Sequence, residues 1–193
     1  MPKLTVVVGA VTRPGRLNKA AGWTVDKART IGPDITTDLI NLGEYKIAFA
    51  DGRPPADYGD DTGGVVERIA SSDAVIFASP VYRGSFTGSL KNLLDQLPIE
   101  ALMGKPVGIV AMGATPHHFL GVDWHLRDVL AWFGAFVPPT SVYLTSADFV
   151  DGEPSESARR DLHALAAALI KMRSLASGAN DFLGPLPLAA HKS

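Results

Sequence analysis

Residues 74–97 read AVIFASPVYRGSFTGSLKNLLDQL and contain a strand pattern, a loop pattern and a helix pattern in succession. The apolar run at 74–78 is typical of a strand buried on both faces of a sheet. Residues 79–88 carry a proline, two glycines and several polar residues, which indicates a loop. The spacing i, i+3, i+4, i+7 then predicts a helix that ends before Pro98, with its apolar stripe at Leu90, Leu93, Leu94 and Leu97.

The same alternation continues on both sides of this unit. Further strands are expected at 4–8 and 107–112, with weaker candidates at 35–42 and 142–144. Helical spacing recurs at 126–133, before Gly134, and at about 155–173. Strands that alternate with helices form right-handed βαβ crossovers. The sequence therefore predicts an α/β fold, a doubly wound three-layer sandwich with five parallel strands and five helices.

Two stretches interrupt the pattern. Residues 43–61 are rich in Gly, Pro and Asp, and the segment from Ser174 onward contains Gly178, Gly184, Pro185 and Pro187. Such segments are usually surface loops or loose termini. We expect a single domain over residues 1–173 and an extended or flexible tail over 174–193.

Composition excludes several classes of function. The chain has 193 residues, 46% of them hydrophobic, and 18 basic against 20 acidic residues, so no basic surface indicates nucleic acid or anionic lipid as a partner. It has no cysteine, which excludes disulfides, thiolate nucleophiles and cysteine-ligated metals. No segment resembles a signal peptide or a membrane span. We expect a soluble, cytoplasmic protein whose redox chemistry, if any, comes from a bound cofactor.

The loop after the first strand is a candidate phosphate site. Ligands of doubly wound sheets bind outside the carboxyl ends of the strands, where the strand order reverses. Residues 9–18 read GAVTRPGRLN, so backbone amides at a helix N-terminus could bind an anion, with Arg13 or Arg16 adding charge. The loop has neither the second glycine of a dinucleotide fingerprint nor the Lys-Ser/Thr pair of a Walker A loop. The alternative is an ordinary loop with two solvated arginines.

The loops after the third and fourth strands are candidates for holding a planar group. Residues 79–88 combine Pro80, Tyr82 and two glycines, which lets the backbone approach a flat ring closely. Residues 113–118, GATPHH, leave the next strand and could border the same crevice. A phosphate and a ring at these positions describe a mononucleotide such as FMN. Tyr82 alone could equally be a packing residue, and the adjacent His117 and His118 lack the spacing of a metal site.

Residues 79–95, SPVYRGSFTGSLKNLLD, resemble the signature of the NAD(P)H-dependent FMN reductases, T/S-P-x-Y followed by G-x-L-K-x-x-L-D. The likeness continues through 97–105 and 118–130, where it resembles the sulfonate-starvation branch. Reductases of that branch supply reduced FMN to a separate alkanesulfonate monooxygenase. A Tyr often stands there where this chain has Trp124, and that Tyr is linked to a distorted helix turn at the subunit interface.

The resemblance implies a flavodoxin-like fold with strand order 2-1-3-4-5 and hydride transfer from NAD(P)H to FMN. The phosphate loop departs from the family pattern G-S-x-R-x-x-S, because Ala10 replaces the first Ser and Arg16 stands near the second. The implied cofactor-binding residues fall in three groups, and no side-chain acid or base is required, so no catalytic residue is assigned. The phosphate group is Thr12, Arg13, Arg16, Leu17 and Asn18; the ring-edge group is Pro80, Val81, Tyr82 and Arg83; the opposite side is Gly113, Ala114 and Thr115.

Three functions remain open at this point. A flavin reductase passes reduced FMN to a flavin-dependent monooxygenase, whereas a prosthetic-FMN reductase keeps it and reduces quinones, azo compounds or metal oxyanions. A flavodoxin-type carrier only shuttles electrons, and we rank it last because carriers of that kind are strongly acidic while this chain has a net charge of −2. Apolar residues all around the helix near Trp124 also predict a homo-oligomer, either a dimer or a dimer of dimers.

Overall fold

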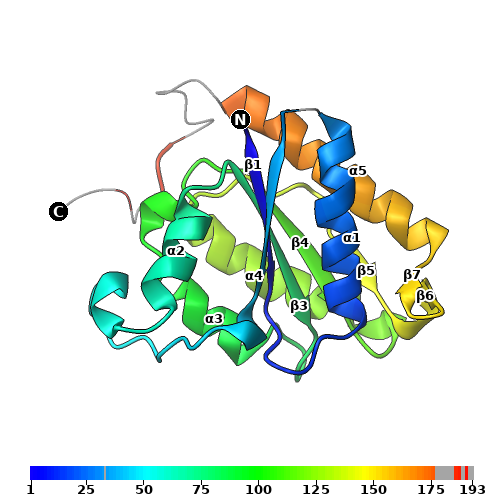
Figure 1. Ribbon diagram of the computed structural model, residues 1–193, viewed down its shortest axis with the longest axis horizontal. Helices are drawn as coiled ribbons and strands as arrows, with labels where there is room; N and C mark the ends of the chain where they lie inside the picture. The colour runs from blue at the N-terminus through cyan, green and yellow to red at the C-terminus, as the bar shows by residue number, and fades with distance from the viewer. Residues whose placement is uncertain (33, 177–184, 188–189, 191–193) are drawn as a thin grey trace.

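The computed structural model describes residues 1–32, 34–176, 185–187 and 190. Within them, five parallel strands form one sheet in the order β2-β1-β3-β4-β5 (Figure 1). The predicted α/β fold and its strand order are thus confirmed. The strands are β1 (Lys3–Val8), β2 (Thr36–Asn41), β3 (Ala74–Pro80), β4 (Val107–Met112) and β5 (Val142–Leu144).

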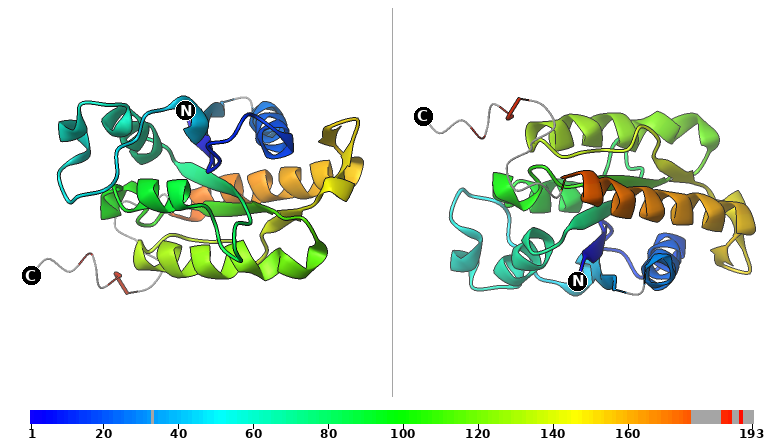
Figure 2. Two further views of the ribbon diagram at one scale, coloured as in Figure 1. Left: turned by 90° about the horizontal axis from the view of Figure 1, so that it is seen from below. Right: turned by 90° about the horizontal axis from the view of Figure 1, so that it is seen from above.

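Helices cover both faces of the sheet. Helices α1 and α5 lie side by side on one face, while α2, α3 and α4 pack against the other (Figure 2). Each face has its own apolar core, because alternate residues of the central strands point to opposite sides; Val6 contributes to one and Val7 to the other. The helices of the described residues are α1 (Arg16–Ile31), α2 (Thr62–Ala70), α3 (Gly88–Leu94), α4 (Phe119–Trp132) and α5 (Glu156–Ala176).

The chain reverses its winding direction between β1 and β3. After β1 it enters α1 on one face, and after β3 it enters α3 on the other face. The two strands are hydrogen-bonded neighbours, with Val8 opposite Ala78 at their carboxyl ends. This is the switch point at which doubly wound sheets open a crevice for a ligand.

Three details differ from or extend the sequence-based expectations. Helix α5 continues past Arg173 to Ala176, since no helix-breaking residue precedes Gly178. An unpredicted antiparallel hairpin, β6 (Phe149–Val150) with β7 (Glu153–Pro154), follows β5. Helix α4 is a continuous α-helix through Trp124, without the distorted turn linked to the family's Tyr.

The other predicted irregular segments have mixed outcomes. Residues 43–61 contain only two short 3-10 helices, η1 (Leu42–Glu44), which begins one residue earlier, and η2 (Pro55–Tyr58). Most of the predicted tail after Ala176 lies outside the described residues. No helix in the described part of the chain is long and apolar enough to cross a membrane.

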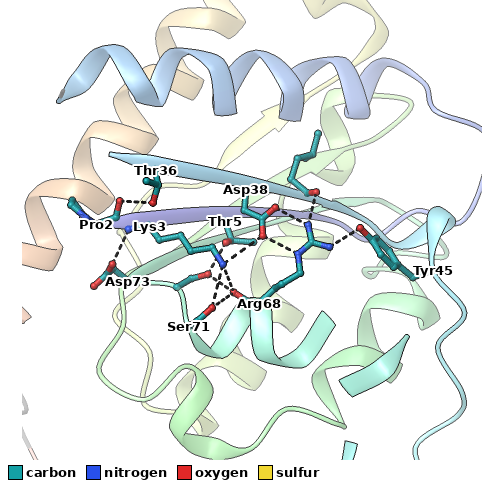
Figure 3. A network of polar contacts seen from close by, with 11 residues as sticks. Pro2, Lys3, Thr5, Thr36, Asp38, Tyr45, Arg68, Ser71 and Asp73 are labelled. Atoms are coloured by element: carbon teal, nitrogen blue, oxygen red, sulfur yellow. Dashed lines mark hydrogen bonds and ion pairs between the residues drawn. The ribbon is translucent and has the colours of Figure 1, made fainter. Parts of the chain in front are cut away.

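A polar network ties β2 to β1 and α2 at the edge of the sheet (Figure 3). The Asp38 carboxylate accepts hydrogen bonds from Arg68 Nε at 2.9 Å and Nη2 at 2.7 Å, and Lys3 Nζ lies 3.6 Å from it. Arg68 also donates to the Tyr45 hydroxyl at 2.6 Å. The guanidinium of Arg68 is the main reason that the pKa of Asp38 is lowered from its ordinary value.

Replacing Asp38 should destabilise the fold in a pH-dependent way. A carboxyl whose pKa is lowered by folding stabilises the protein above its unfolded pKa of about 3.9, and that contribution is lost as the pH falls through the lower folded value. We expect Asp38→Asn to lower the free energy of unfolding by about 1–2 kcal/mol at pH 7 and by progressively less below about pH 4. Denaturant unfolding across pH 3–7 measures this difference. Asp26→Asn, at an exposed ion pair with Arg29, is the control that should have little effect; an effect of Asp38→Asn that does not change with pH would contradict the assignment.

Candidate active site

The three candidate loops meet at the carboxyl edge of the sheet. Gly9 N donates to Ala78 O at 2.7 Å, which joins the first loop to β3. Val81 N donates to Met112 O at 2.8 Å, and Gly113 N donates to Leu144 O at 2.9 Å. The sequence-predicted residues thus come from neighbouring strand ends, with the loops after β1 and β3 side by side at the lower edge of Figure 1.

Helix α1 presents its first turn to this edge. Gly15 is the N-cap, and its N–H donates to the Asn18 side-chain oxygen at 2.9 Å. The first intrahelical bond runs from Lys19 N to Gly15 O at 3.1 Å, so the amides of Arg16, Leu17 and Asn18 have no carbonyl four residues back in the helix. A helix N-terminus with such amides attracts anions.

Two cations beside this turn are available to an external anion. Arg13 and Arg16 are exposed, as is Thr12, and neither arginine has an ion-pair partner among the residues that the structure describes. Lys19, one turn further along α1, is instead bound to Glu153 of the β6–β7 hairpin, with Nζ and Oε1 2.6 Å apart. The arrangement therefore leaves the two arginines as the free positive charges of the loop.

The loop after β3 forms a tight reversal that presents Tyr82 and Arg83. Tyr82 N donates to Ser85 O at 2.8 Å, and Ser85 N donates to Tyr82 O at 3.1 Å. Arg83 has φ 53° and Gly84 φ 79°, the left-handed pair typical of a type I′ turn. A non-glycine residue in that region is strained, which occurs often at functional sites. Tyr82 is 52% exposed at the start of this turn.

Hydroxyl groups bind the first and second loops together. Thr87 Oγ1 and Ser89 Oγ both donate to Gly9 O, the latter at 3.0 Å. Thr87 is also the N-cap of α3 and accepts from Leu90 N at 3.2 Å. A Cβ on Gly9 would lie 2.8 Å from Leu90 Cβ, so only glycine allows this approach. Thr87 and Ser89 are positioning residues that no sequence pattern predicted, although both belong to the family-like segment.

The third loop is held by Tyr143 of β5, another residue that the sequence analysis did not assign to the site. Its hydroxyl donates to Thr115 O at 2.7 Å, and burial raises the pKa of this phenol. A Cβ on Gly113 would lie 1.9 Å from that hydroxyl oxygen and 3.4 Å from Val81 Cγ2. A side chain at position 113 would displace the Tyr143 hydroxyl from Thr115 O. Gly113 and Tyr143 therefore form a long-range contact that local sequence does not reveal.

The second loop also contacts the start of α4. A Cβ on Gly121 would lie 2.7 Å from Gly84 O, which places the two backbones in close contact. Two cavities of about 400 Å³ lie away from the three loops, one between β5 and α5 and one between α3 and α4. No group of three or more His, Asp or Glu residues arranged for a metal ion occurs in the described part of the chain.

Comparison with known proteins agrees with this architecture. The sequence model described as "NADPH-dependent FMN reductase" matches residues 2–149. The chain belongs to the NADPH-dependent FMN reductase family. The resemblance seen in residues 79–95 is thereby confirmed.

Curated relatives of the family align over part of their length. The chain is 37% identical over 123 residues to an NAD(P)H-dependent FAD/FMN reductase of Geobacillus thermodenitrificans. This alignment covers 64% of this chain and 66% of the relative. It is 35% identical over 117 residues to the NADH-dependent FMN reductase SfnF of Pseudomonas fluorescens. This alignment covers 61% of this chain and 63% of the relative. The chain thus spans slightly under two thirds of the length of these relatives.

Solved structures support the fold. An apo NADH:FMN oxidoreductase, EMOB, superposes with a TM-score of 0.76 at 23% identity, covering all of this chain and 97% of the other. An archaeal flavodoxin superposes with a TM-score of 0.63 at 9% identity, covering 89% and 99%. Likenesses at this level of identity establish a flavodoxin-like fold.

Adding a side chain at Gly9 should disturb the junction between the first two loops. We expect Gly9→Ala to lower the free energy of unfolding by about 1–3 kcal/mol, because the new methyl group overlaps Leu90 Cβ. Gly64→Ala is the matched control, since a Cβ there meets nothing within 4 Å and alanine favours the helix. Denaturant unfolding of both variants measures the effect, and a neutral Gly9→Ala would show that the close contact is absent.

Proposed function

We propose that this chain is an NAD(P)H-dependent FMN reductase. The observation that carries the proposal is the pair Arg13 and Arg16, without ion-pair partners among the described residues, beside the first turn of α1 at the switch point of the sheet. This arrangement suits a terminal phosphate dianion, because charge-assisted bonds from guanidinium groups add to those of the helix amides. The name of the family supports the rest of the assignment.

We infer that these loops can accommodate FMN. A Cβ at Gly15 would meet only Arg13 O at 4.0 Å, and one at Gly84 would meet nothing within 4 Å, so both turns face open space. We assign the phosphate to Thr12, Arg13, Arg16 and the amides of Leu17 and Asn18. The ring edge is assigned to residues 80–83 and its other side to residues 113–115.

When bound, FMN supplies a ring that accepts hydride from NAD(P)H. The chain's own residues act by position. The type I′ turn fixes Tyr82 and Arg83 at one side of the crevice, and Tyr143 fixes the backbone of residues 113–115 at the other. Thr87 and Ser89 keep these elements in register with the phosphate loop. We assign to the protein the orientation of FMN and NAD(P)H relative to each other. We assign proton transfer to no side chain.

We further propose that FMN exchanges with solvent and that a flavin-dependent monooxygenase receives the reduced form. Residues 11–16 and Tyr82 to Gly84 are exposed, so FMN can reach these loops directly from solvent. The proposed location is the cytoplasm, where NAD(P)H is available.

The activity can be tested directly with purified protein. NAD(P)H oxidation should require added FMN, saturate with it and be unaffected by a metal chelator. Dialysis should remove FMN from the protein if FMN is a substrate. Activity that a chelator abolishes and zinc restores would refute the assignment, as would NAD(P)H oxidation with no dependence on flavin.

Removing the Arg16 guanidinium should weaken FMN binding specifically. We expect Arg16→Ala to cost about 1.5–3 kcal/mol, roughly 10- to 150-fold in Kd, because a charge-assisted contact to the phosphate is lost. Quenching of flavin fluorescence measures the Kd. Lys27→Ala, which removes an exposed cation at the far end of α1, should leave Kd unchanged. Equal losses in the two variants would show that the effect is one of net charge alone.

We also propose a homo-oligomer, a dimer or a dimer of dimers, that completes this site. Helix α4 exposes four large apolar side chains, and its first turns contact the ring-edge loop through Gly121. Such a concentration of exposed apolar surface is typical of an interface. The side chains are Phe119 (52% exposed), Leu120 (46%), Trp124 (65%) and Trp132 (58%).

A charge at position 124 should disrupt both assembly and flavin binding. Trp124→Glu would place an unpaired charge in the proposed interface, so we expect a lower assembly state and a weaker FMN affinity. Light scattering and flavin titration at the same protein concentration measure the two effects. A monomeric wild type with full FMN affinity would contradict this coupling.

A further inference from the structure

Lys19 is a third basic residue near the candidate phosphate position, and unlike Arg13 and Arg16 it has an ion-pair partner. It follows Arg16 by three residues and the N-cap Gly15 by four, so these residues share one face of α1. Side chains of a helix lean toward its N-terminus, which brings the long stem of Lys19 toward the first turn. An unpaired ammonium here would add to the charge available to an anion at that turn.

The ammonium of Lys19 is held by the β6–β7 hairpin. Lys19 Nζ and Glu153 Oε1 are 2.6 Å apart, and the two side chains are 50% and 51% exposed. A Cβ on Gly152 would lie 3.3 Å from Lys19 Nζ, so the cation also rests against the hairpin turn. Strand β7 packs against α1, and the hairpin lies beside this helix (Figure 2). Glu153 thus places a carboxylate close to the turn that is proposed to bind the phosphate.

The hairpin that carries this carboxylate is anchored at its base. Asp148 Oδ2 accepts hydrogen bonds from Thr145 N at 2.7 Å and from Thr145 Oγ1 at 2.9 Å, and Ser155 N donates to Asp148 O at 2.8 Å. Phe149 packs against the core that α1 and α5 cover, and Pro154 is buried. The hairpin is therefore a fixed support, and the carboxylate stays beside α1.

A phosphate at the first turn of α1 would compete with Glu153 for the same ammonium. Lys19 carries a single positive charge, so any share of it that the carboxylate takes is lost to the phosphate. The carboxylate also repels a phosphate dianion at short range. In both respects Glu153 weakens the binding of a phosphorylated ligand, while a ligand without the phosphate is not affected.

We propose that Glu153 is a positioning residue that holds Lys19 away from the phosphate and so limits the affinity for FMN. This rests on the proposed function, in which the first turn of α1 binds the phosphate. The two arginines attract the phosphate, and the carboxylate keeps the third cation from joining them, so the ion pair sets how readily the flavin exchanges. The helix and the hairpin belong to one chain, so the effect does not depend on assembly.

A charge cycle on the ion pair tests the proposal, with quenching of flavin fluorescence as the readout. Glu153→Gln frees the ammonium and should lower the Kd for FMN by about 3- to 10-fold, because one exposed cation gains a doubly charged partner. Lys19→Gln leaves the carboxylate unpaired and should raise this Kd by a similar factor. The double variant should lie within about 2-fold of the wild type, because the two changes cancel. The Kd for riboflavin should be the same in all four proteins.

Glu156→Gln is the matched control for net charge. The Glu156 side chain is 91% exposed at the start of α5 and lies 3.7 Å from Arg160, so its neutralisation leaves Lys19 bound to Glu153. The Kd for FMN should stay within about 2-fold of the wild type. Equal gains in Glu156→Gln and Glu153→Gln would overturn the proposal. A Kd for FMN that Glu153→Gln leaves unchanged or raises would overturn it as well.

The wild-type protein separates a failure of this proposal from a failure of the proposed function. If FMN and riboflavin bind the wild type equally, the first turn of α1 does not hold the phosphate, and both the phosphate assignment and the role of Glu153 are wrong. If the wild type prefers FMN and Glu153→Gln has no effect, only the role of Glu153 is wrong. The reductase activity keeps its own test, which is NAD(P)H oxidation that requires FMN.

Discussion

The carbonyl oxygen of Gly9 accepts hydrogen bonds from Thr87 and Ser89, and this contact joins the two halves of the doubly wound fold at their switch point. It requires glycine, because Leu90 Cβ occupies the space where a side chain would begin. The same contact joins the loop that leads into α1 to the start of α3, which follows the turn that presents Tyr82. The candidate phosphate and ring positions therefore both depend on the contact between Gly9 and the start of α3. Because this contact also holds α3 against the sheet, the stability of the fold and the geometry of the site are coupled.

The candidate loops are exposed in a single chain, which gives assembly a role at this site. A single chain offers exposed loops at the carboxyl edge of the sheet, while its 400 Å³ cavities lie elsewhere. The apolar surface of α4 reaches the ring-edge loop through the contact of Gly121 with Gly84. A second copy that covers this surface would add a wall beside the exposed loops. Ligand binding and association would then stabilise each other, since each favours the same ordered arrangement.

Much of the fold could be predicted because its information is local. The apolar runs of β1, β3 and β4 and the helical stripe at Leu90 to Leu97 reflect burial on one or both faces, which periodicity records directly. The β6–β7 hairpin was missed because its strands are two residues long, although Asp151-Gly152 is a typical type I′ turn pair. The roles of Tyr143 at Gly113 and of Asn92 at Ala50 depend on residues about 30 and 42 positions apart. No local pattern could have revealed those contacts.

The central claim is that the first turn of α1 binds a phosphate while the turn at Tyr82 and the loop at Gly113 border a ring. Backbone amide chemical shifts during titration with FMN and, separately, with riboflavin test it most directly. We expect FMN to shift the amides of Arg16 to Asn18 together with those of Tyr82 to Ser85 and Gly113 to Thr115, whereas riboflavin should shift only the last two groups. Identical responses to both flavins, or shifts centred on the cavity between β5 and α5, would contradict it.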